Sequence, residues 1–162
     1  MRAVSDTSPI NYLLQIEEIE ILRDLYGRIA VPAAVLVELK AAESPAVVRS
    51  WATRQPDWVE VCIPARELTQ KLTHLGAGER DAIALAQEIG ADVLIIDERL
   101  GATEAENRGL HVTGTLGVLE KAAGLGLIDL KQALSRLLAT NFRIRRSIVE
   151  TLLKRHESRE AK

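Results

Sequence analysis

Short apolar runs alternate with helical patterns along this chain, and the alternation constrains the fold more than any other feature. The run Val93–Ile96 is wholly apolar and follows a helical pattern over Glu79–Glu88 that ends at Gly90. An apolar run this short is typical of a strand covered on both faces, as in a parallel sheet. The other strand candidates are Ala3–Ser5, Arg28–Val31, Trp58–Val61 and His111–Thr113. The sequence therefore predicts an α/β fold with a central parallel sheet.

Two Ser-Pro pairs predict where helices begin. Ser8 and Ser44 would each cap a helix whose first residue is the proline that follows. The end of the chain reads as helical, with patterns over Leu116–Ala123, Leu130–Leu138 and Ile148–Leu153. A length of 162 residues fits one domain. We expect an α/β domain over residues 1–125 and a helical extension over residues 126–162 that packs on it.

Composition excludes several classes of protein. Hydrophobic residues make up 47% of the chain and charged residues 27%, which is typical of a globular protein with a sizeable core. Aromatic residues are only 3%, so a protein that stacks bases on a row of rings is disfavoured. Cys62 is the single cysteine, which excludes an internal disulfide and a multi-cysteine zinc site. With no signal peptide and no membrane-length apolar run, we expect a cytoplasmic protein without membrane contact.

Acidic residues directly follow two of the predicted strands. Asp6 follows the first strand and Asp97 follows the most hydrophobic one. Ligands of open parallel sheets bind at the carboxyl ends of the strands, so the two carboxylates would meet if these strands are neighbours. Each residue also has an ordinary explanation, because Asp6 could cap the next helix and Asp97 could begin one.

Three further acids lie in helical patterns. Glu38 is flanked by apolar residues, whereas Glu79 and Asp81 lie in the first turn of a helix, where the helix dipole tolerates negative charge. Acids from four chain segments together resemble an oxygen-ligand site. Such sites suit Mg²⁺ or Mn²⁺ rather than zinc, and they support metal-assisted attack of water on a phosphodiester.

These acids stand in segments that resemble the PIN-domain superfamily, in particular a PIN-like branch of unknown function that is related to VapC-like toxins. The order and spacing of the segments are more specific than any one of them. The matching segments are Val4–Pro9, Pro32–Leu39, Leu75–Ala86, Asp92–Arg99 and His111–Leu119. The resemblance implies a three-layer α/β/α PIN-like fold with C-terminal helices. It also implies a divalent-metal-dependent ribonuclease, commonly the toxin of a toxin–antitoxin pair, with RNA and a small antitoxin protein as partners.

The resemblance also implies which residues act. The catalytic positions correspond to four acids: Asp6, Glu38, Asp81 and Asp97. Asp6 and Asp97 would hold the metal, and Asp81 or its rival Glu79 would complete the ligand set. Two acids two residues apart on a helix point in different directions, and the wider superfamily position favours Asp81. Glu38 would bind the metal through water or help to deprotonate the attacking water.

Two supporting residues and one departure accompany these acids. Thr7 could position a ligand or water beside Asp6, although Thr7 or Ser8 could equally cap a helix. Many VapC-like proteins carry Thr or Ser two residues before the last Asp, where this chain has Ile95. The departure keeps a second hypothesis open, namely a catalytically impaired PIN-like module that binds RNA or another protein.

Basic residues are concentrated at the end of the chain. From Phe142 to Lys162 there are seven Lys or Arg and three Glu. Such a charge run is usually a solvated face, but it could also steer phosphate towards an acidic site. The candidate RNA-binding residues are Arg99, Arg108, Arg143, Arg145 and Arg146. An apolar stripe along the same tail could dock on the body, a partner or a second protomer, and we expect a homodimer.

Other phosphoryl-transfer folds fit less well. A haloacid-dehalogenase-like phosphatase needs a second Asp two residues after the first, and that position is Ser8. A response-regulator receiver needs paired acids after its first strand, whereas Asp6 stands alone. No glycine-rich phosphate loop with Lys and Ser or Thr is present, which excludes a P-loop nucleoside triphosphatase.

Overall fold

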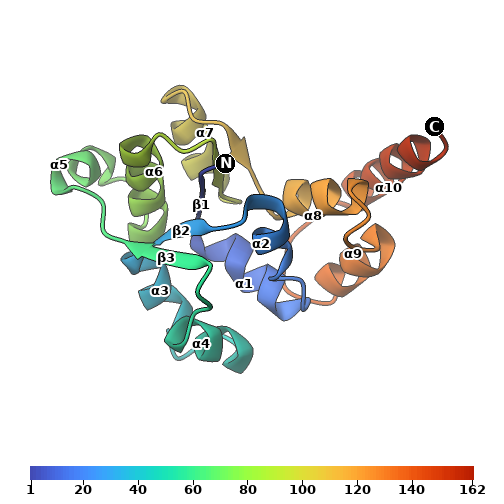
Figure 1. The fold of residues 1–162 in the computed structure, drawn as a ribbon, viewed down its shortest axis with the longest axis horizontal. Coiled ribbons are helices and arrows are strands. Elements are labelled where there is room, and N and C mark those ends of the chain that lie inside the picture. Colours follow the sequence, from blue (N-terminus) through green and yellow to red (C-terminus); the bar gives the residue numbers. More distant parts are fainter.

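A computed structural model describes all 162 residues and shows one sheet of five parallel strands (Figure 1). The strands are β1 (Ala3–Ser5), β2 (Ile29–Pro32), β3 (Val59–Cys62), β4 (Val93–Ile95) and β5 (Val112–Thr113). Their order across the sheet is β3-β2-β1-β4-β5. The chain runs outward from β1 to β3 and then returns to the other side of β1, so the strand order reverses between β1 and β4. Ligands of open α/β sheets bind at such a reversal.

Ten α-helices and one short 3₁₀ helix surround the sheet. They are α1 (Thr7–Gln15), α2 (Ile21–Tyr26), α3 (Ala33–Leu39), α4 (Ala46–Thr53), α5 (Arg66–Thr69), η1 (Gln70–Leu72), α6 (Ala77–Ile89), α7 (Arg99–Asn107), α8 (Thr115–Gly124), α9 (Leu130–Leu138) and α10 (Arg146–Glu160). The two short helices α5 and η1 are not signalled by the sequence pattern. The other helices form between the strands, singly or in pairs, or follow β5 as the three C-terminal helices.

Alternate side chains of the strands enter two separate hydrophobic cores. Ala3, Val93 and Ile95 pack in a core of 29 buried residues with α1–α4 and α8–α10. Val4 and Leu94 point the other way, into a core of 12 buried residues with α6 and α7. Because successive strand residues point to opposite faces, both faces must be covered. The predicted three-layer α/β/α architecture is confirmed.

Both predicted Ser-Pro helix starts are wrong by one or two residues. Helix α1 begins at Thr7, with Asp6 as its N-cap, so Pro9 is its third residue. This is tolerated because the first helical N–H groups have no intrahelical partner to lose. Helix α4 begins at Ala46, and Pro45 itself is the N-cap.

The C-terminal helices pack on the same body as the sheet. Leu134 and Leu137 of α9 and Leu152 of α10 belong to the larger core. The Arg155 guanidinium bonds both carboxylate oxygens of Glu120, at 2.6 and 2.7 Å, and ties α10 to α8. Beyond these contacts α10 extends away from the sheet (Figure 1). The boundary near residue 125 stays a prediction, and no helix is both long and apolar enough to cross a bilayer.

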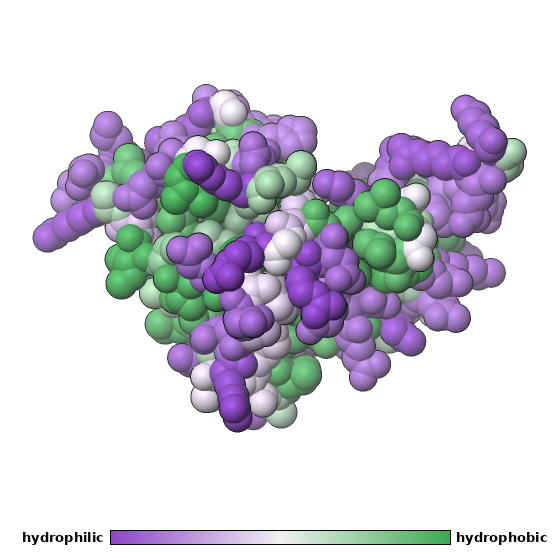
Figure 2. Space-filling view, viewed as in Figure 1, coloured by the Kyte–Doolittle hydropathy of each residue, from purple (hydrophilic) through white to green (hydrophobic).

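Hydropathy is uneven over the C-terminal part of the surface. Figure 2 shows hydrophilic side chains along α10 and a hydrophobic group at the turn between α8 and α9. Leu125 and Leu127 in that turn are 66% and 43% exposed.

Candidate active site

Asp6 lies at the carboxyl end of the central strand, and one of its oxygens has no partner. The backbone N–H of Asp6 continues the sheet by donating to the Ile95 carbonyl at 2.9 Å. The side chain is only 3% exposed, yet Oδ1 accepts no hydrogen bond and the carboxylate does not cap α1. A buried polar atom without a partner is rare and is costly to the fold.

The ionised form of Asp6 is strongly disfavoured. Burial, opposed by the backbone N–H of Thr7, raises the pKa of Asp6 from 3.8 to about 7, and the nearby carboxylates add to the rise. Those carboxylates are Glu38, Glu79 and Asp97. Asp6 is therefore held in a negative, poorly hydrated environment that a cation would relieve.

Asp97 follows β4 by two residues and holds the start of α8. Its carboxylate accepts hydrogen bonds from the Thr115 backbone N–H at 2.7 Å and from the Thr115 hydroxyl at 2.6 Å. Burial raises the pKa of Asp97 although these bonds lower it, and Glu98 adds to the rise. A Cβ at Gly114 would lie 2.7 Å from Asp97 Oδ1, so the close approach requires glycine. Asp97 does not begin the next helix, since Glu98 is the N-cap of α7.

Glu38 connects three helices at the same edge of the sheet. From α3 its carboxylate accepts the Thr7 hydroxyl of α1 and the Gly78 backbone N–H of α6, the latter at 2.9 Å. A Cβ at Gly78 would lie 2.5 Å from Glu38 Oε2. Thr7 thus supports Glu38 rather than capping its own helix.

Glu79 and Asp81 lie in different surroundings. Burial raises the pKa of Glu79, and Glu98 and Glu38 contribute further, so its carboxylate faces the acidic cluster. Asp81 lies 3.5 Å from the Arg80 guanidinium instead and is not among the charges that act on Asp6. Glu79 is, with Glu38 and Asp97, one of the three carboxylates whose charge raises the pKa of Asp6, while the catalytic role of Asp81 stays a prediction.

These acids stand on the fold of a known family. The family model of the PIN domain matches residues 2–158. The chain belongs to the PIN-domain family. PIN domains are generally nucleases that use divalent metal ions, so the chain has a nuclease-type fold. No curated protein and no solved structure matches the chain significantly.

The acidic residues of this PIN domain fit a divalent cation by their chemistry. All the donors are carboxylate oxygens, which Mg²⁺ and Mn²⁺ prefer, and Asp6 Oδ1 is buried without a partner. No three acidic, histidine or cysteine side chains already form a ready metal site. The hydrogen bonds of Glu38 and Asp97 to neighbouring helices hold these carboxylates in their present positions.

Ile95 stands where many VapC-like proteins have a hydroxyl. It pairs with Ser5 across β1 and β4, is fully buried and belongs to the larger core. The side chain is therefore a packing residue in this PIN domain. The hydroxyl next to Asp97 comes from Thr115 instead, a residue that the sequence analysis did not single out.

Three of the five candidate RNA-binding arginines lie beside Asp97. Arg99, Arg143 and Arg145 line a cavity of about 710 Å³ that Asp97 also lines. None of the three has an ion pair within the protein. Arg108 instead bonds Glu104 at 2.8 Å and Gln87 at 3.3 Å, and the exposed Arg146 pairs with Glu150 at 3.6 Å. Ser8 lines a smaller cavity on the same side, together with Asp97.

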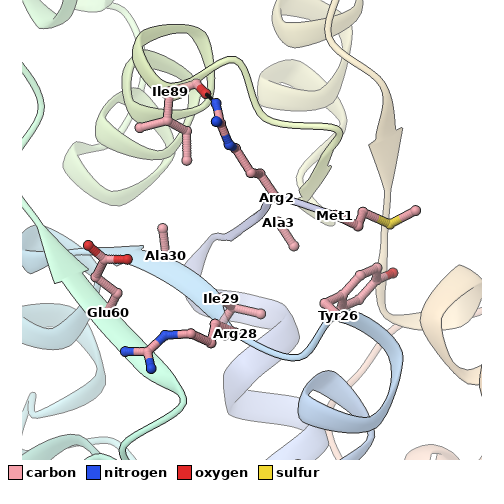
Figure 3. A pocket seen from close by; sticks show the side chains of 9 residues that line it. All are labelled: Met1, Arg2, Ala3, Tyr26, Arg28, Ile29, Ala30, Glu60 and Ile89. Atoms are coloured by element: carbon pink, nitrogen blue, oxygen red, sulfur yellow. Dashed lines mark hydrogen bonds between the residues drawn. The ribbon is translucent and has the colours of Figure 1, made fainter.

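A cavity of about 480 Å³ lies at the opposite edge of the sheet, at the amino ends of the strands (Figure 3). Met1, Arg2, Tyr26, Arg28 and Glu60 are among its lining residues. In Figure 3 the Arg2 side chain points towards the end of α6, where its guanidinium donates to the Ile89 carbonyl at 2.6 Å. This cavity gathers no group of carboxylates.

Proposed function

We propose that this PIN domain is a divalent-metal-dependent ribonuclease that hydrolyses RNA phosphodiester bonds in the cytoplasm. The observation that carries the proposal is the buried, unpartnered oxygen of Asp6 among three other carboxylates at the reversal of strand order. Like charges in such a site are stable only when they are protonated or bound to a cation. The unpaired arginines beside Asp97 supply the opposite charge that a phosphate backbone requires.

The acids have different roles in the proposed reaction. Asp6 and Asp97 would hold Mg²⁺ or Mn²⁺, and Glu79 or Asp81 would complete the set. When bound, such an ion lowers the pKa of water and stabilises charge on the phosphate. Glu38 accepts a proton from the attacking water as the water oxygen bonds to phosphorus. The bond between phosphorus and the leaving ribose oxygen breaks, and that oxygen takes up a proton from solvent. Thr7 and the Gly78 N–H orient the Glu38 carboxylate for this step.

Cleavage of single-stranded RNA with Mn²⁺ tests the proposal. Asp6→Asn keeps the shape of the side chain and removes its charge, so we expect cleavage to fall by at least about a hundredfold. Asp57→Asn is the matched control because Asp57 is exposed and makes no hydrogen bond or ion pair. Equal activity of wild type and Asp6→Asn, or an inactive wild type with every divalent metal, would contradict the proposal. Inactivity would favour the impaired binding module that Ile95 suggests.

The proposed biological role is that of the toxin in a toxin–antitoxin pair. The resemblance to VapC-like toxins supports this role, with a small antitoxin protein as partner and a homodimer as the assembly. Expression of wild type, but not of Asp6→Asn, should arrest growth, and a small adjacent gene should restore it. Light scattering of the purified chain gives its mass and tests the dimer. Growth that continues with an enzyme active in vitro would contradict the toxin role alone.

A further inference from the structure

We propose that the segment between α9 and α10 forms a pocket for one unpaired nucleotide of the RNA strand, next to the acids. The inference rests on the proposed nuclease function and adds a base-binding subsite to it. We call this site the nucleotide pocket. It is lined by Ser8, Tyr12, Arg99, Asn141, Phe142 and Arg143, with Asp97 and Glu98 on the wall that faces the acids.

The nucleotide pocket has the size and place that a single nucleotide needs. Its volume is about 410 Å³, within the usual range of small-ligand sites. The neighbouring cavity of about 710 Å³ shares Asp97, Arg99, Phe142 and Arg143 with it. A strand that passes Asp97 can therefore place a nucleotide on either side of Phe142.

The nucleotide pocket concentrates a scarce residue type. The chain has one phenylalanine and two tyrosines, and Phe142 and Tyr12 lie together beside Asp97. Their ring centroids are 4.9 Å apart and their planes are inclined at 85°. In such an edge-to-face pair at least one face of each ring is free of the other ring, and Phe142 is only half-buried. A free aromatic face beside a phosphodiester-cleaving site suits stacking of a base.

Polar groups of the nucleotide pocket complement the other parts of a nucleotide. Arg99 and Arg143 have no partner in the protein, and a guanidinium binds phosphate through paired hydrogen bonds. The Tyr12 hydroxyl donates to Asn141 Oδ1 at 2.9 Å. This bond orients the Asn141 side chain and leaves its NH₂ group without a partner, so the NH₂ group can donate to a base carbonyl.

The arginines in the nucleotide pocket differ from most others in the protein. Arg155 and Arg159 bond Glu120, and Arg108 bonds Glu104. These residues serve the fold. Arg143 lies in the exposed linker between α9 and α10, beside the Phe142 ring and the Asn141 amide. Its guanidinium makes no contact that stabilises the fold.

Binding of small nucleotides without metal tests the nucleotide pocket independently of cleavage. Uridine 5′-monophosphate, adenosine 5′-monophosphate and ribose 5-phosphate would be titrated into the ¹⁵N-labelled chain while the Asn141 side-chain amide is followed by NMR. Because stacking adds to phosphate binding, we expect both nucleotides to bind about tenfold more tightly than ribose 5-phosphate. Equal affinity for all three compounds, or no change at the Asn141 amide, would overturn the proposal.

Variants separate stacking from charge and from folding. Phe142→Leu keeps an apolar side chain in the core contact but removes the ring, so the preference for nucleotides should disappear. Phe142→Trp should restore it. Arg143→Ala should weaken all three compounds by a similar factor. A Phe142→Leu chain that melts like wild type and still prefers nucleotides contradicts the stacking role.

The nucleotide pocket and the nuclease proposal can fail separately. An enzyme that cleaves RNA but shows no nucleotide preference keeps the nuclease function and loses the nucleotide pocket. A chain that binds nucleotides at Asn141 but cleaves nothing loses the nuclease function. In an active enzyme, wild type should cleave RNA with one abasic position next to the cleavage site about tenfold more slowly than normal RNA. The Phe142→Leu variant should cleave the two RNAs at the same rate.

Discussion

The two edges of the sheet differ in whether their charged residues have hydrogen-bond partners. At the amino ends of the strands, the Arg2 backbone N–H donates to Asp92 at 2.6 Å and the Arg2 guanidinium donates to Ile89 at 2.6 Å. At the carboxyl ends, Asp6 is buried with an unpartnered oxygen and a pKa raised to about 7. A charged group whose hydrogen bonds are satisfied adds to stability, whereas a buried carboxylate oxygen without a partner is costly to the fold and is typical of a functional site.

The pH dependence of stability is the largest expected sign of this difference. The pKa of Asp6 is raised in the folded state, so the folded chain binds a proton that the unfolded chain releases, and stability falls as pH rises. A shift from 3.8 to about 7 corresponds to roughly 4 kcal/mol lost between about pH 4 and pH 8 without metal. Urea unfolding across this range measures the loss. Asp6→Asn should remove it, and an Asp6→Asn chain with an unchanged slope would contradict the assigned environment.

The stabilisation of the folded chain by Mn²⁺ should depend on the carboxyl edge of the sheet and not on the amino edge. At a hundredfold excess of Mn²⁺ over its Kd, binding to the folded state adds about 2.7 kcal/mol, or roughly 5–10 °C in Tm. Asp6→Asn should lose this shift. Asp92→Asn weakens the amino edge and should lower Tm while keeping the shift. A Mn²⁺ shift that survives Asp6→Asn would place the metal elsewhere.

Gly78→Ala sharpens the comparison within the acidic edge. The new Cβ would lie 2.5 Å from Glu38 Oε2 and displace the carboxylate from the Gly78 N–H. We expect RNA cleavage to fall about tenfold, since misplaced catalytic groups lose rate. Gly124→Ala is the control, because a Cβ there meets nothing within 4 Å, and it should add about 0.5–1 kcal/mol of stability. Full activity of Gly78→Ala would show that the position of Glu38 is not critical.

Thr115→Val tests whether the Thr115 hydroxyl holds Asp97 in position, and its expected effect is smaller than those above. It removes the hydroxyl bond and keeps the backbone bond, so stability should fall by about 1 kcal/mol. The pKa of Asp97 should rise further, and Mn²⁺ affinity should fall about tenfold, as for other residues that orient ligands. Calorimetric titration measures the affinity, with exposed Thr73→Val as the control. Unchanged affinity would mean that Thr115 serves only the start of α8.

Arg28→Ala is the variant with the smallest expected effect. Arg28 lines the cavity at the amino edge and has no ion pair. The Arg28→Ala variant should keep both its Mn²⁺ affinity and its rate of RNA cleavage within about twofold of wild type, since substitutions at exposed positions change little. Arg143→Ala, at the other edge, should raise the KM for RNA. Equal effects of the two arginine variants would erase the distinction between the edges.

Much of the fold could be predicted because strand and helix periodicities are local. The apolar runs and glycine stops predicted all five strands to within one residue at each end. The helix starts at Ser8 and Ser44 failed because Ser-Pro is compatible with several positions in a first helical turn. The 3₁₀ turn at Gln70–Leu72 has too few residues to show a period.

The site was less predictable. The acids at the strand ends could be named from the sequence, but their distances could not. Asp81 matches the wider superfamily position, whereas the folded chain turns Glu79 towards Glu38. The composition disfavoured base stacking, yet the single phenylalanine lies beside Asp97. A percentage records how many rings exist and not where they lie.

The sequence by itself determined the parallel α/β architecture, the PIN-domain family and the set of acids that could form a site. Those features depend on local periodicity and on the order of motifs along the chain. Only the tertiary structure decided that Asp6 keeps an unpartnered oxygen, that Thr115 holds Asp97, and that residues 141–143 reach the same edge. These facts depend on the strand order and on helix packing, which bring together side chains more than a hundred positions apart, as Tyr12 and Asn141 show.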